Sequence, residues 1–260
     1  MINNELGSPQ RFGYAWKKFN QILPIHEKQF QRWIGNLPPE YFKGKIVLDA
    51  GCGIGRNSFW PLKYEAKHVI AFDYEGSTVH VAKANLINFK NCDVQQASIY
   101  DFECNFTGDF DFVQSIGVIH HLDNPNLALD NLVRQTKRGG MVLIWIYARE
   151  GNENLLRLLL PIRKLSKLLP MPILNLISYL MTIPFYIFLK FFPIKHEYYY
   201  NAKEFSLQHL RSIILDQLLP RIAKYYSREE ALNLLRTAKL VDIEIYKING
   251  NSWTVTGYRA

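Results

Sequence analysis

A strand-like segment that ends in an acid and then breaks into alternating glycines constrains this chain more than any other feature. The apolar residues 46–48 lead into Asp49, and Gly51, Gly53 and Gly55 follow at every second position. Glycines here let the backbone turn sharply, let a ligand approach the main chain, and let the next helix pack closely on a sheet. The pattern predicts a buried strand, a ligand-binding loop and a helix.

A dinucleotide is not the expected ligand of this loop, because the dinucleotide fingerprint needs glycine where Arg56 stands. The segment D-x-G-C-G-x-G at 49–55 instead resembles the first motif of the class I S-adenosylmethionine-dependent methyltransferases. The resemblance implies S-adenosylmethionine as cofactor, with Asp49, Gly51, Cys52 and Gly53 around its methionine end. The alternative is a tight turn whose glycines are only structural.

A second strand is expected at 68–73, and it ends in Asp73 about 20 residues after the loop. The resemblance implies that Asp73 holds the ribose hydroxyls and that the adjacent Tyr74 also borders the cofactor. The alternative role for Asp73 is the N-cap of the next helix, and the two roles can coexist.

A third strand, expected at 94–97, leads to Ser98 and Ile99. The family commonly has an aspartate at the Ser98 position, where it contacts the adenine amino group, so this chain departs from the pattern. The Ser98 hydroxyl can still accept a hydrogen bond, and the Ile99 N–H can meet a ring nitrogen. Asp101 is an alternative contact.

Residues 110–122 form an apolar strand followed by two histidines. They resemble the F-D-x-V-x-S-x-G-V-L-H-H-L signature of the ubiquinone/menaquinone-type (methyltransferase type 11) branch. The resemblance implies that Ser115 presents main chain near the methionine end and that His120 or His121 is the catalytic base. The alternative is a structural role for each histidine. No third ligand follows at suitable spacing, so no metal site is expected.

Five strand signals alternate with helix-length segments in residues 41–150, which predicts an α/β fold with a doubly wound, mostly parallel sheet of seven strands in the methyltransferase manner. Residues 41–150 form the cofactor-binding core. Residues 227–260 supply a final helix, opened by a capping-box pattern at Ser227, and an antiparallel hairpin with strands at 240–246 and 253–258.

Residues 1–40 are expected to form a helical cap. The segment 12–16 resembles an F-G-x-x-W segment that precedes the glycine motif in related methyltransferases. Tyr14 and Trp16 are therefore expected at the cofactor or at the substrate entrance, since aromatic faces suit a sulfonium cation. The alternative is packing of these rings on the edge of the sheet.

An apolar insertion occupies residues 151–226, and so long a connection is usually functional. Four cations in 155–167 are expected on one side of a helix, and 168–189 carries no charge. That run is long enough to span a bilayer, but its prolines and the return of the chain to the sheet argue against a span. We expect a helical lid, with peripheral membrane contact through 151–195; plain core packing is the alternative.

The net charge of +8 would suit a nucleic-acid partner. No basic run with interleaved aromatic residues is present, however, so no nucleic-acid partner is expected. The three cysteines lack metal-type spacing and are expected as free thiols. No secretory signal pattern opens the chain, which predicts a cytoplasmic protein, peripheral at the inner face of a membrane.

The expected function is transfer of a methyl group from S-adenosylmethionine to an oxygen or carbon of a hydrophobic small molecule, quinol-like or lipid-like. One alternative acceptor is a polar metabolite or a sugar of a surface glycan. A second alternative is a non-catalytic, membrane-docked protein that binds S-adenosylmethionine.

Overall fold

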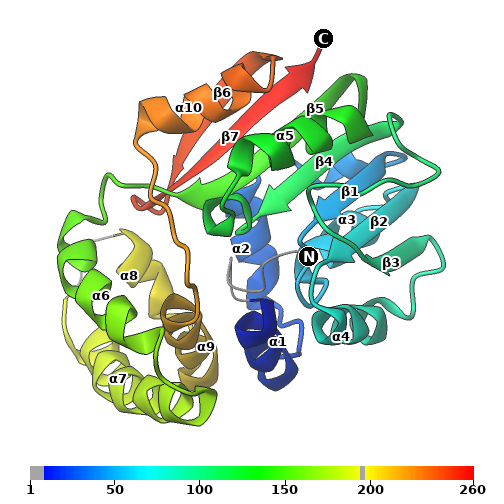
Figure 1. Ribbon diagram of the computed structural model, residues 1–260. Helices are drawn as coiled ribbons and strands as arrows, with labels where there is room; N and C mark the ends of the chain where they lie inside the picture. Colours follow the sequence, from blue (N-terminus) through cyan, green and yellow to red (C-terminus); the bar gives the residue numbers. More distant parts are fainter. Residues whose placement is uncertain (1–8, 194–196) are drawn as a thin grey trace.

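The computed structural model describes residues 9–193 and 197–260, and a seven-stranded sheet lies at its centre (Figure 1). The strand order is β3-β2-β1-β4-β5-β7-β6. The strands are β1 (Ile46–Ala50), β2 (His68–Asp73), β3 (Cys92–Gln96), β4 (Phe110–Ile116), β5 (Thr136–Tyr147), β6 (Leu240–Ile248) and β7 (Ser252–Arg259). All neighbours are parallel except β7, which is antiparallel to β5 and β6. The predicted doubly wound sheet with its terminal hairpin is confirmed.

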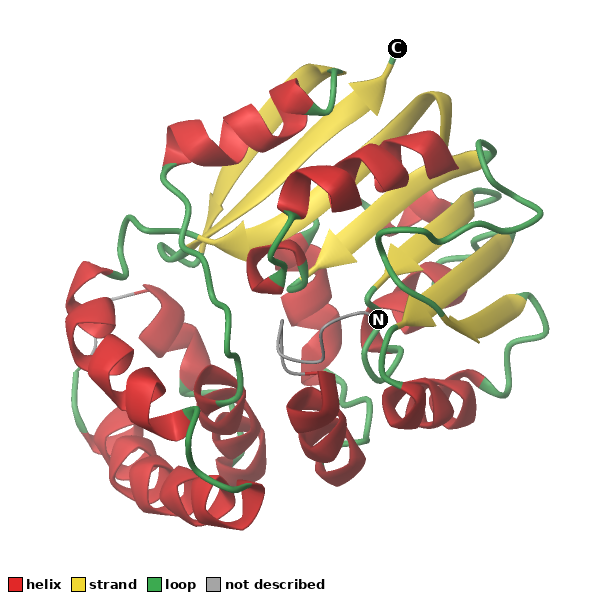
Figure 2. Cartoon of the chain, viewed as in Figure 1, coloured by secondary structure: helices red, strands yellow, loops and turns green. Residues whose placement is uncertain are grey.

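Helices cover both faces of the sheet (Figure 2). On one face α5 (Pro125–Gln135) and α10 (Arg228–Thr237) bury aliphatic side chains against the strands. On the other face α2 (Ile25–Trp33), the short helix η1 (Pro39–Phe42), α3 (Arg56–Lys63) and α4 (Gly76–Leu86) enclose a cluster rich in aromatic rings. Two cores of this kind hold the central strands firmly, because β1, β2 and β4 are buried on both sides.

The register of the parallel strands brings their carboxyl ends to one edge. Ala50 of β1 lies beside Phe72 of β2, and Asp73 lies beside Gln96 of β3. The second short helix η2 (Ile119–His121) follows β4 at the same edge. The loops expected to carry chemistry therefore meet in space, as they do in open α/β sheets generally.

Within the predicted insertion, the described residues 151–193 and 197–226 form four helices beside this edge (Figure 1). They are α6 (Glu153–Ser166), α7 (Met171–Phe191), α8 (Glu197–Ala202) and α9 (Leu207–Leu218). Helix α1 (Pro9–Lys18) contacts both α4 and α9, so it joins the core to the insertion. Residues 1–8 of the expected N-terminal cap lie outside the described part of the chain.

The two ends of the insertion are joined at the sheet. Ala148 and Tyr226 form a parallel bridge, and the Arg149 N–H donates to the Tyr226 carbonyl oxygen at 2.9 Å. The Tyr226 N–H in turn donates to the Tyr147 carbonyl oxygen at 3.0 Å. The chain thus leaves the end of β5 and returns to it.

One expectation about the insertion is wrong. Arg157 and Lys164 on α6 and Lys167 at its C-cap are exposed, but Arg163 is buried and turned toward α9. Helix α6 runs on through Pro161, so its periodicity continues and separates the four cations. Arg163 finds hydrogen-bond acceptors in α9 that replace water, which is why a guanidinium is tolerated there.

Candidate active site

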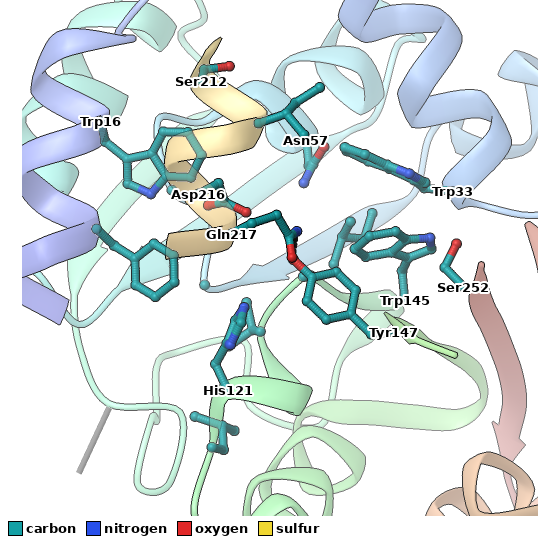
Figure 3. Close-up of a pocket in the computed structure, with 18 of the residues that line it drawn as sticks. Trp16, Trp33, Asn57, His121, Trp145, Tyr147, Ser212, Asp216, Gln217 and Ser252 are labelled. Carbon is teal, nitrogen blue, oxygen red and sulfur yellow. Dashed lines mark hydrogen bonds between the residues drawn. The ribbon is translucent and has the colours of Figure 1, made fainter. Parts of the chain in front are cut away.

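A cavity of about 970 Å³ opens where the carboxyl ends of the strands face the insertion (Figure 3). One wall comes from the glycine loop, the ends of β2 and β4, and helix α1; the other comes from α6, α7, α8 and α9. Predicted site residues that line it are Trp16, Gly51, Cys52, Gly53, Asp73, Tyr74, Ser98, Ile99 and His121. The structure thus brings together most of the residues that were selected from separate motifs.

The glycine loop is shaped by backbone conformations that disfavour other residues. Gly51 has φ +78°, and a Cβ atom there would lie 2.4 Å from a methyl carbon of Val118. Gly53 has φ +56°, and a Cβ there would meet only the Trp16 ring, at 3.8 Å or more. Gly51 therefore allows the loop after β4 to approach, whereas Gly53 leaves main chain accessible to a ligand.

Gly55 plays the packing role expected of the third glycine. Its φ is +82°, and a Cβ there would lie 2.9 Å from a methyl carbon of Leu86 in α4. Helices α3 and α4 consequently lie close together behind the loop.

Asp73 is anchored to the glycine loop. Its Oδ2 accepts the Gly53 N–H at 3.0 Å, and its Oδ1 accepts the Glu75 N–H at 3.1 Å. Burial raises the pKa of this carboxyl, and the two backbone donors partly oppose the rise. Each carboxylate oxygen keeps a lone pair, so Asp73 can still accept from a pair of vicinal hydroxyl groups.

The alternative role of Asp73 as a helix N-cap is wrong. Helix α4 is capped by Glu75, whose carboxylate accepts the Ser77 N–H at 3.2 Å. Because the cap lies two residues nearer the helix, the Asp73 side chain remains at the cavity wall.

Ser98 and Ile99 line the cavity as expected. The Ser98 Oγ accepts the Tyr100 N–H at 3.2 Å, which leaves its hydroxyl proton available for an acceptor. The Ile99 carbonyl accepts from the Asn131 amide at 3.0 Å, and this bond holds the loop on α5. Asp101, the alternative contact, also lines the cavity.

Asp49 and Ser115 lie behind the cavity wall. Asp49 is buried, accepts from the Ser58 hydroxyl at 2.6 Å, and has a pKa raised to about 6 by that burial. The Ser115 hydroxyl donates to the Ala50 carbonyl oxygen at 3.1 Å. Both side chains therefore shape the loops from beneath rather than contact the cavity directly.

The two histidines have different surroundings. His120 is fully buried, does not line the cavity, and neither ring nitrogen has a hydrogen-bond partner in the described residues. The His121 ring lines the cavity, and its Nδ1 lies 2.8 Å from the Ile222 carbonyl oxygen. A carbonyl only accepts, so Nδ1 carries the proton and Nε2 keeps its lone pair. Burial lowers the pKa of His121 to about 4.

Trp16 and Tyr14 also differ in whether they reach the cavity. Trp16 faces the glycine loop from α1, while Tyr14 is exposed and does not line the cavity (Figure 3). Two helical positions differ by about 200°, so only one of the pair can face the core side. The guanidinium of Arg56 lies 5.5 Å from the Trp16 ring and 5.1 Å from the Trp33 ring.

Sequence reasoning missed several residues of the cavity. Arg56 was considered only as evidence against a dinucleotide. A cation directly after a glycine loop is also a signal of an anionic group on the ligand. Trp33, Trp145, Tyr147, Asp216 and Gln217 also line the cavity. The positions of Asp216 and Gln217 depend on how α9 folds back, and no local pattern marks them.

A polar network lies inside the apolar lid. The Arg163 side chain donates to the Gln217 carbonyl oxygen at 2.8 Å, to the Gln217 side-chain oxygen at 2.7 Å and to the Tyr225 hydroxyl at 2.9 Å. The Gln217 amide donates to the Tyr147 hydroxyl at 3.1 Å. The network thus joins α6 and α9 to the end of β5.

Asp216 lies next to this network and points toward the cavity (Figure 3). Burial raises the pKa of its carboxyl to about 6, although Arg56, Arg163 and the Tyr147 hydroxyl lower it in part. A carboxyl with a pKa this close to neutrality can accept a proton and release it again. No group of three or more His, Cys, Asp or Glu side chains suited to a metal occurs in the described residues.

The amino-acid sequence of the chain is similar to those of known methyltransferases. Residues 48–144 match the type 11 methyltransferase domain. The chain is 26% identical to the ubiquinone biosynthesis O-methyltransferase of Dechloromonas aromatica, over 61% of this chain and 74% of that protein. It is 32% identical to the tRNA U34 carboxymethyltransferase of Campylobacter fetus, over 49% of this chain and 45% of that protein. A match to an uncharacterized Synechococcus protein spans only 26% of that relative.

Solved structures share the fold. The magnesium protoporphyrin IX methyltransferase of Synechocystis, solved with S-adenosylhomocysteine, superposes with a TM-score of 0.56 at 13% identity, covering 95% of this chain and 94% of that chain. The glycine loop and Asp73 of the present chain fit such a cofactor, because accessible main chain at Gly53 meets a carboxylate at the cavity wall. The matched segment, residues 48–144, is a class I S-adenosylmethionine-dependent methyltransferase domain of the type 11 branch, and S-adenosylmethionine is its cofactor.

Proposed function

We propose that this protein transfers a methyl group to an oxygen of a hydrophobic small molecule, quinol-like or lipid-like. The observation that carries the proposal is the wall opposite the glycine loop. Apolar and aromatic side chains from the insertion form it, namely Leu155, Leu158, Leu159, Met181, Phe185, Tyr198 and Phe205. Such a wall gains free energy by removing an apolar acceptor from water.

The cofactor supplies a methyl group already activated by its sulfonium charge. The chain needs to bind, to orient and to exclude water. The Gly53 main chain and the Asp73 carboxylate are the proposed contacts to the methionine end and the ribose. Arg56, next to the same loop, is the proposed partner of the amino-acid carboxylate, because a guanidinium matches a carboxylate in charge and shape.

Two groups are available to take the acceptor proton. The pKa of Asp216 is about 6, whereas that of His121 is about 4. The carboxylate is therefore the stronger base near neutral pH, and it is already ionised there. We assign proton removal to Asp216. His121 Nε2 then serves as a hydrogen-bond acceptor that positions the acceptor hydroxyl.

The names of relatives support more than one acceptor class. The ubiquinone enzyme acts in quinone synthesis by its name, and the tRNA enzyme on a nucleoside. The apolar lid favours the first class, because a nucleoside or a glycan sugar would leave many hydroxyl groups without partners there. A polar acceptor, and a protein that binds the cofactor without turnover, remain the competing proposals.

The test uses S-adenosylmethionine labelled on its methyl group. The purified protein is incubated with total cell extract and the products are partitioned between organic solvent and water. Label in the organic phase is expected, and it should vanish with Asp73→Ala. Label in the aqueous phase would replace the hydrophobic acceptor by a polar one. No label above the Asp73→Ala control, with cofactor binding intact, would refute catalysis.

A further inference from the structure

The outer surface of the insertion carries a continuous apolar stripe on α7. Ile173, Leu176, Leu180, Ile183 and Ile187 are all exposed, at intervals of three or four residues. This spacing places them along one side of the helix. The opposite side is buried against α9 and neighbouring helices, through Leu174, Ser178, Thr182 and Leu189.

Helix α6 extends the apolar surface. Leu165 is exposed on α6, and Leu168, in the turn directly after it, is 81% exposed. Phe191 at the end of α7 is 80% exposed. Soluble monomers rarely leave so many large apolar side chains together in water, so a surface of this kind indicates a binding partner.

The charges around this surface are of one sign. Residues 154–196 contain no Asp or Glu, although the whole chain has 23 of them. Arg157, Lys164, Lys167 and Lys190 are exposed beside the stripe. None of these four forms an ion pair within 4.0 Å among the residues that the structure describes. The complementary partner is an apolar phase with a negative surface.

We propose that the outer face of α6 and α7 docks on the surface of a bilayer that contains anionic lipid. The apolar stripe enters the boundary between headgroups and acyl chains, and the four cations contact the headgroups, as in interfacial helices. The proposal concerns where the protein resides, so it does not depend on the acceptor proposed above.

Helix α7 lies on the bilayer and does not cross it. It is the one helix among the described residues that is long and apolar enough to cross, but its inner side is committed to the protein. The Arg211 side chain of α9 donates to Asn175 and, at 3.3 Å, to Ser178, both on α7. If α7 crossed the bilayer, the hydrogen bonds from Arg211 would be broken and α9 would be separated from the sheet.

The docking surface is continuous with the active-site cavity. Leu158 of α6 lines the cavity and is also 66% exposed. Met181 and Phe185 of α7 line the cavity from the same helix whose outer side forms the stripe. An apolar molecule dissolved in the bilayer would therefore meet the lid directly when the protein is docked.

The test measures cosedimentation of the purified full chain with vesicles, without cofactor or acceptor. Phosphatidylcholine vesicles are compared with vesicles that also contain phosphatidylglycerol, at low and high salt. Binding to the anionic vesicles is expected, with weakening at high salt. The double variant Leu176→Asp/Leu180→Asp should bind at least tenfold more weakly. Lys164→Gln/Lys167→Gln should lose about fivefold per cation on anionic vesicles only.

The matched control is Ile87→Asp, which alters an apolar residue that is 76% exposed but lies outside the insertion. This variant should bind vesicles like the unaltered chain. Circular dichroism and cofactor affinity establish that every variant is folded. No binding to anionic vesicles by the folded wild-type protein would overturn the proposal.

Three other outcomes would also overturn it. The first is a dimer, detected by sedimentation velocity, that Leu176→Asp/Leu180→Asp converts to monomer while vesicle binding is absent. The second is membrane-bound protein that resists alkaline carbonate extraction, which would indicate a span. The third is binding to tRNA that depends on Lys164 and Lys167, with no binding to vesicles.

Discussion

The Gly53 N–H donates a 3.0 Å hydrogen bond to the Asp73 carboxylate, so the glycine loop and the end of β2 hold each other in place. The two residues are 20 positions apart in the chain: Gly53 lies in the loop after β1, and Asp73 ends the neighbouring parallel strand β2. The same carboxylate that is proposed to bind the ribose therefore also sets the conformation of the loop that is proposed to bind the methionine end. Changes at Asp73 should affect both halves of the cofactor site.

Replacement of Asp73 by alanine should weaken cofactor binding by about 100-fold or more, because charged hydrogen bonds contribute about 1.5 to 3 kcal/mol each. Isothermal titration calorimetry with S-adenosylhomocysteine measures the affinity. Asp93→Ala is the matched control, since Asp93 pairs with His68 on the neighbouring strand and does not line the cavity. Equal affinity of Asp73→Ala and wild type would refute the ribose assignment.

The Gly51→Ala and Gly44→Ala variants separate backbone strain from steric conflict. Both glycines have φ above +70°, but only Gly51 faces a close neighbour, Val118. Gly44→Ala should lower the free energy of unfolding by about 1 to 2 kcal/mol, from strain alone. Gly51→Ala should lose about 1 to 3 kcal/mol more. Urea unfolding measures both, and equal losses would mean that the β4 loop moves aside freely.

The rate of methyl transfer should rise with pH through about 6, where Asp216 ionises. His121, with a pKa near 4, is already unprotonated over that range and adds no inflection. Single-turnover rates between pH 4.5 and 8 measure the profile. Asp216→Asn should remove the inflection and reduce the rate about 100-fold or more. A profile that keeps its inflection in Asp216→Asn and loses it in His121→Asn would reverse the two roles.

The same Asp216→Asn variant should be more stable than wild type at neutral pH. The pKa of Asp216 in the folded state is raised above the unfolded value near 3.9, so the folded protein keeps the Asp216 proton to higher pH than the unfolded chain does. The free energy of unfolding therefore falls as pH rises from about 4 to about 6. Asparagine escapes that loss, and a gain of about 1 to 2 kcal/mol at pH 7.5 is expected. Thermal unfolding at pH 4.5 and 7.5 should show a clearly larger difference at the higher pH, because only there is Asp216 ionised in both the folded and the unfolded protein.

Adjacent cations on α6 should differ sharply on substitution. Arg163 is buried and bonded to Gln217 and Tyr225, while Lys164 is exposed. Arg163→Leu leaves buried acceptors without donors, and a loss of about 2 to 4 kcal/mol is expected. Lys164→Leu should change stability by less than about 0.5 kcal/mol. Hydrogen exchange across 153–218 should increase for Arg163→Leu alone; uniform protection in both variants would contradict this role.

Most of the core could be predicted because its signals are local. An apolar strand followed at once by glycines or an acid fixes both the element and its place at the sheet edge, and Asp73 was found this way. The capping box at Ser227 is present in full, with reciprocal bonds to Glu230. Such signals depend on neighbours within four residues, so they survive in the sequence alone.

The insertion could be predicted only in outline. That Arg163 turns inward while Lys164 does not depends on acceptors offered by α9, 54 residues away. The same is true of Asp216, whose proximity to the cavity depends on how α9 packs between α1 and α7. Within the histidine pair, adjacent residues of a single short turn face different ways, and the sequence pattern does not distinguish them.

The hydrogen-bonded junction between Ala148 and Tyr226 has a consequence for evolution and for engineering. Since both ends of the insertion meet at one point on β5, the segment between them can be exchanged without altering any strand pairing. A chain in which a short glycine-containing turn replaces 150–225 keeps the junction between Ala148 and Tyr226 and should retain every strand of the sheet. Diversification of acceptor choice in such proteins can therefore proceed by exchange of one segment, which carries the acceptor wall and the proposed base Asp216, while the cofactor-binding sheet is unchanged.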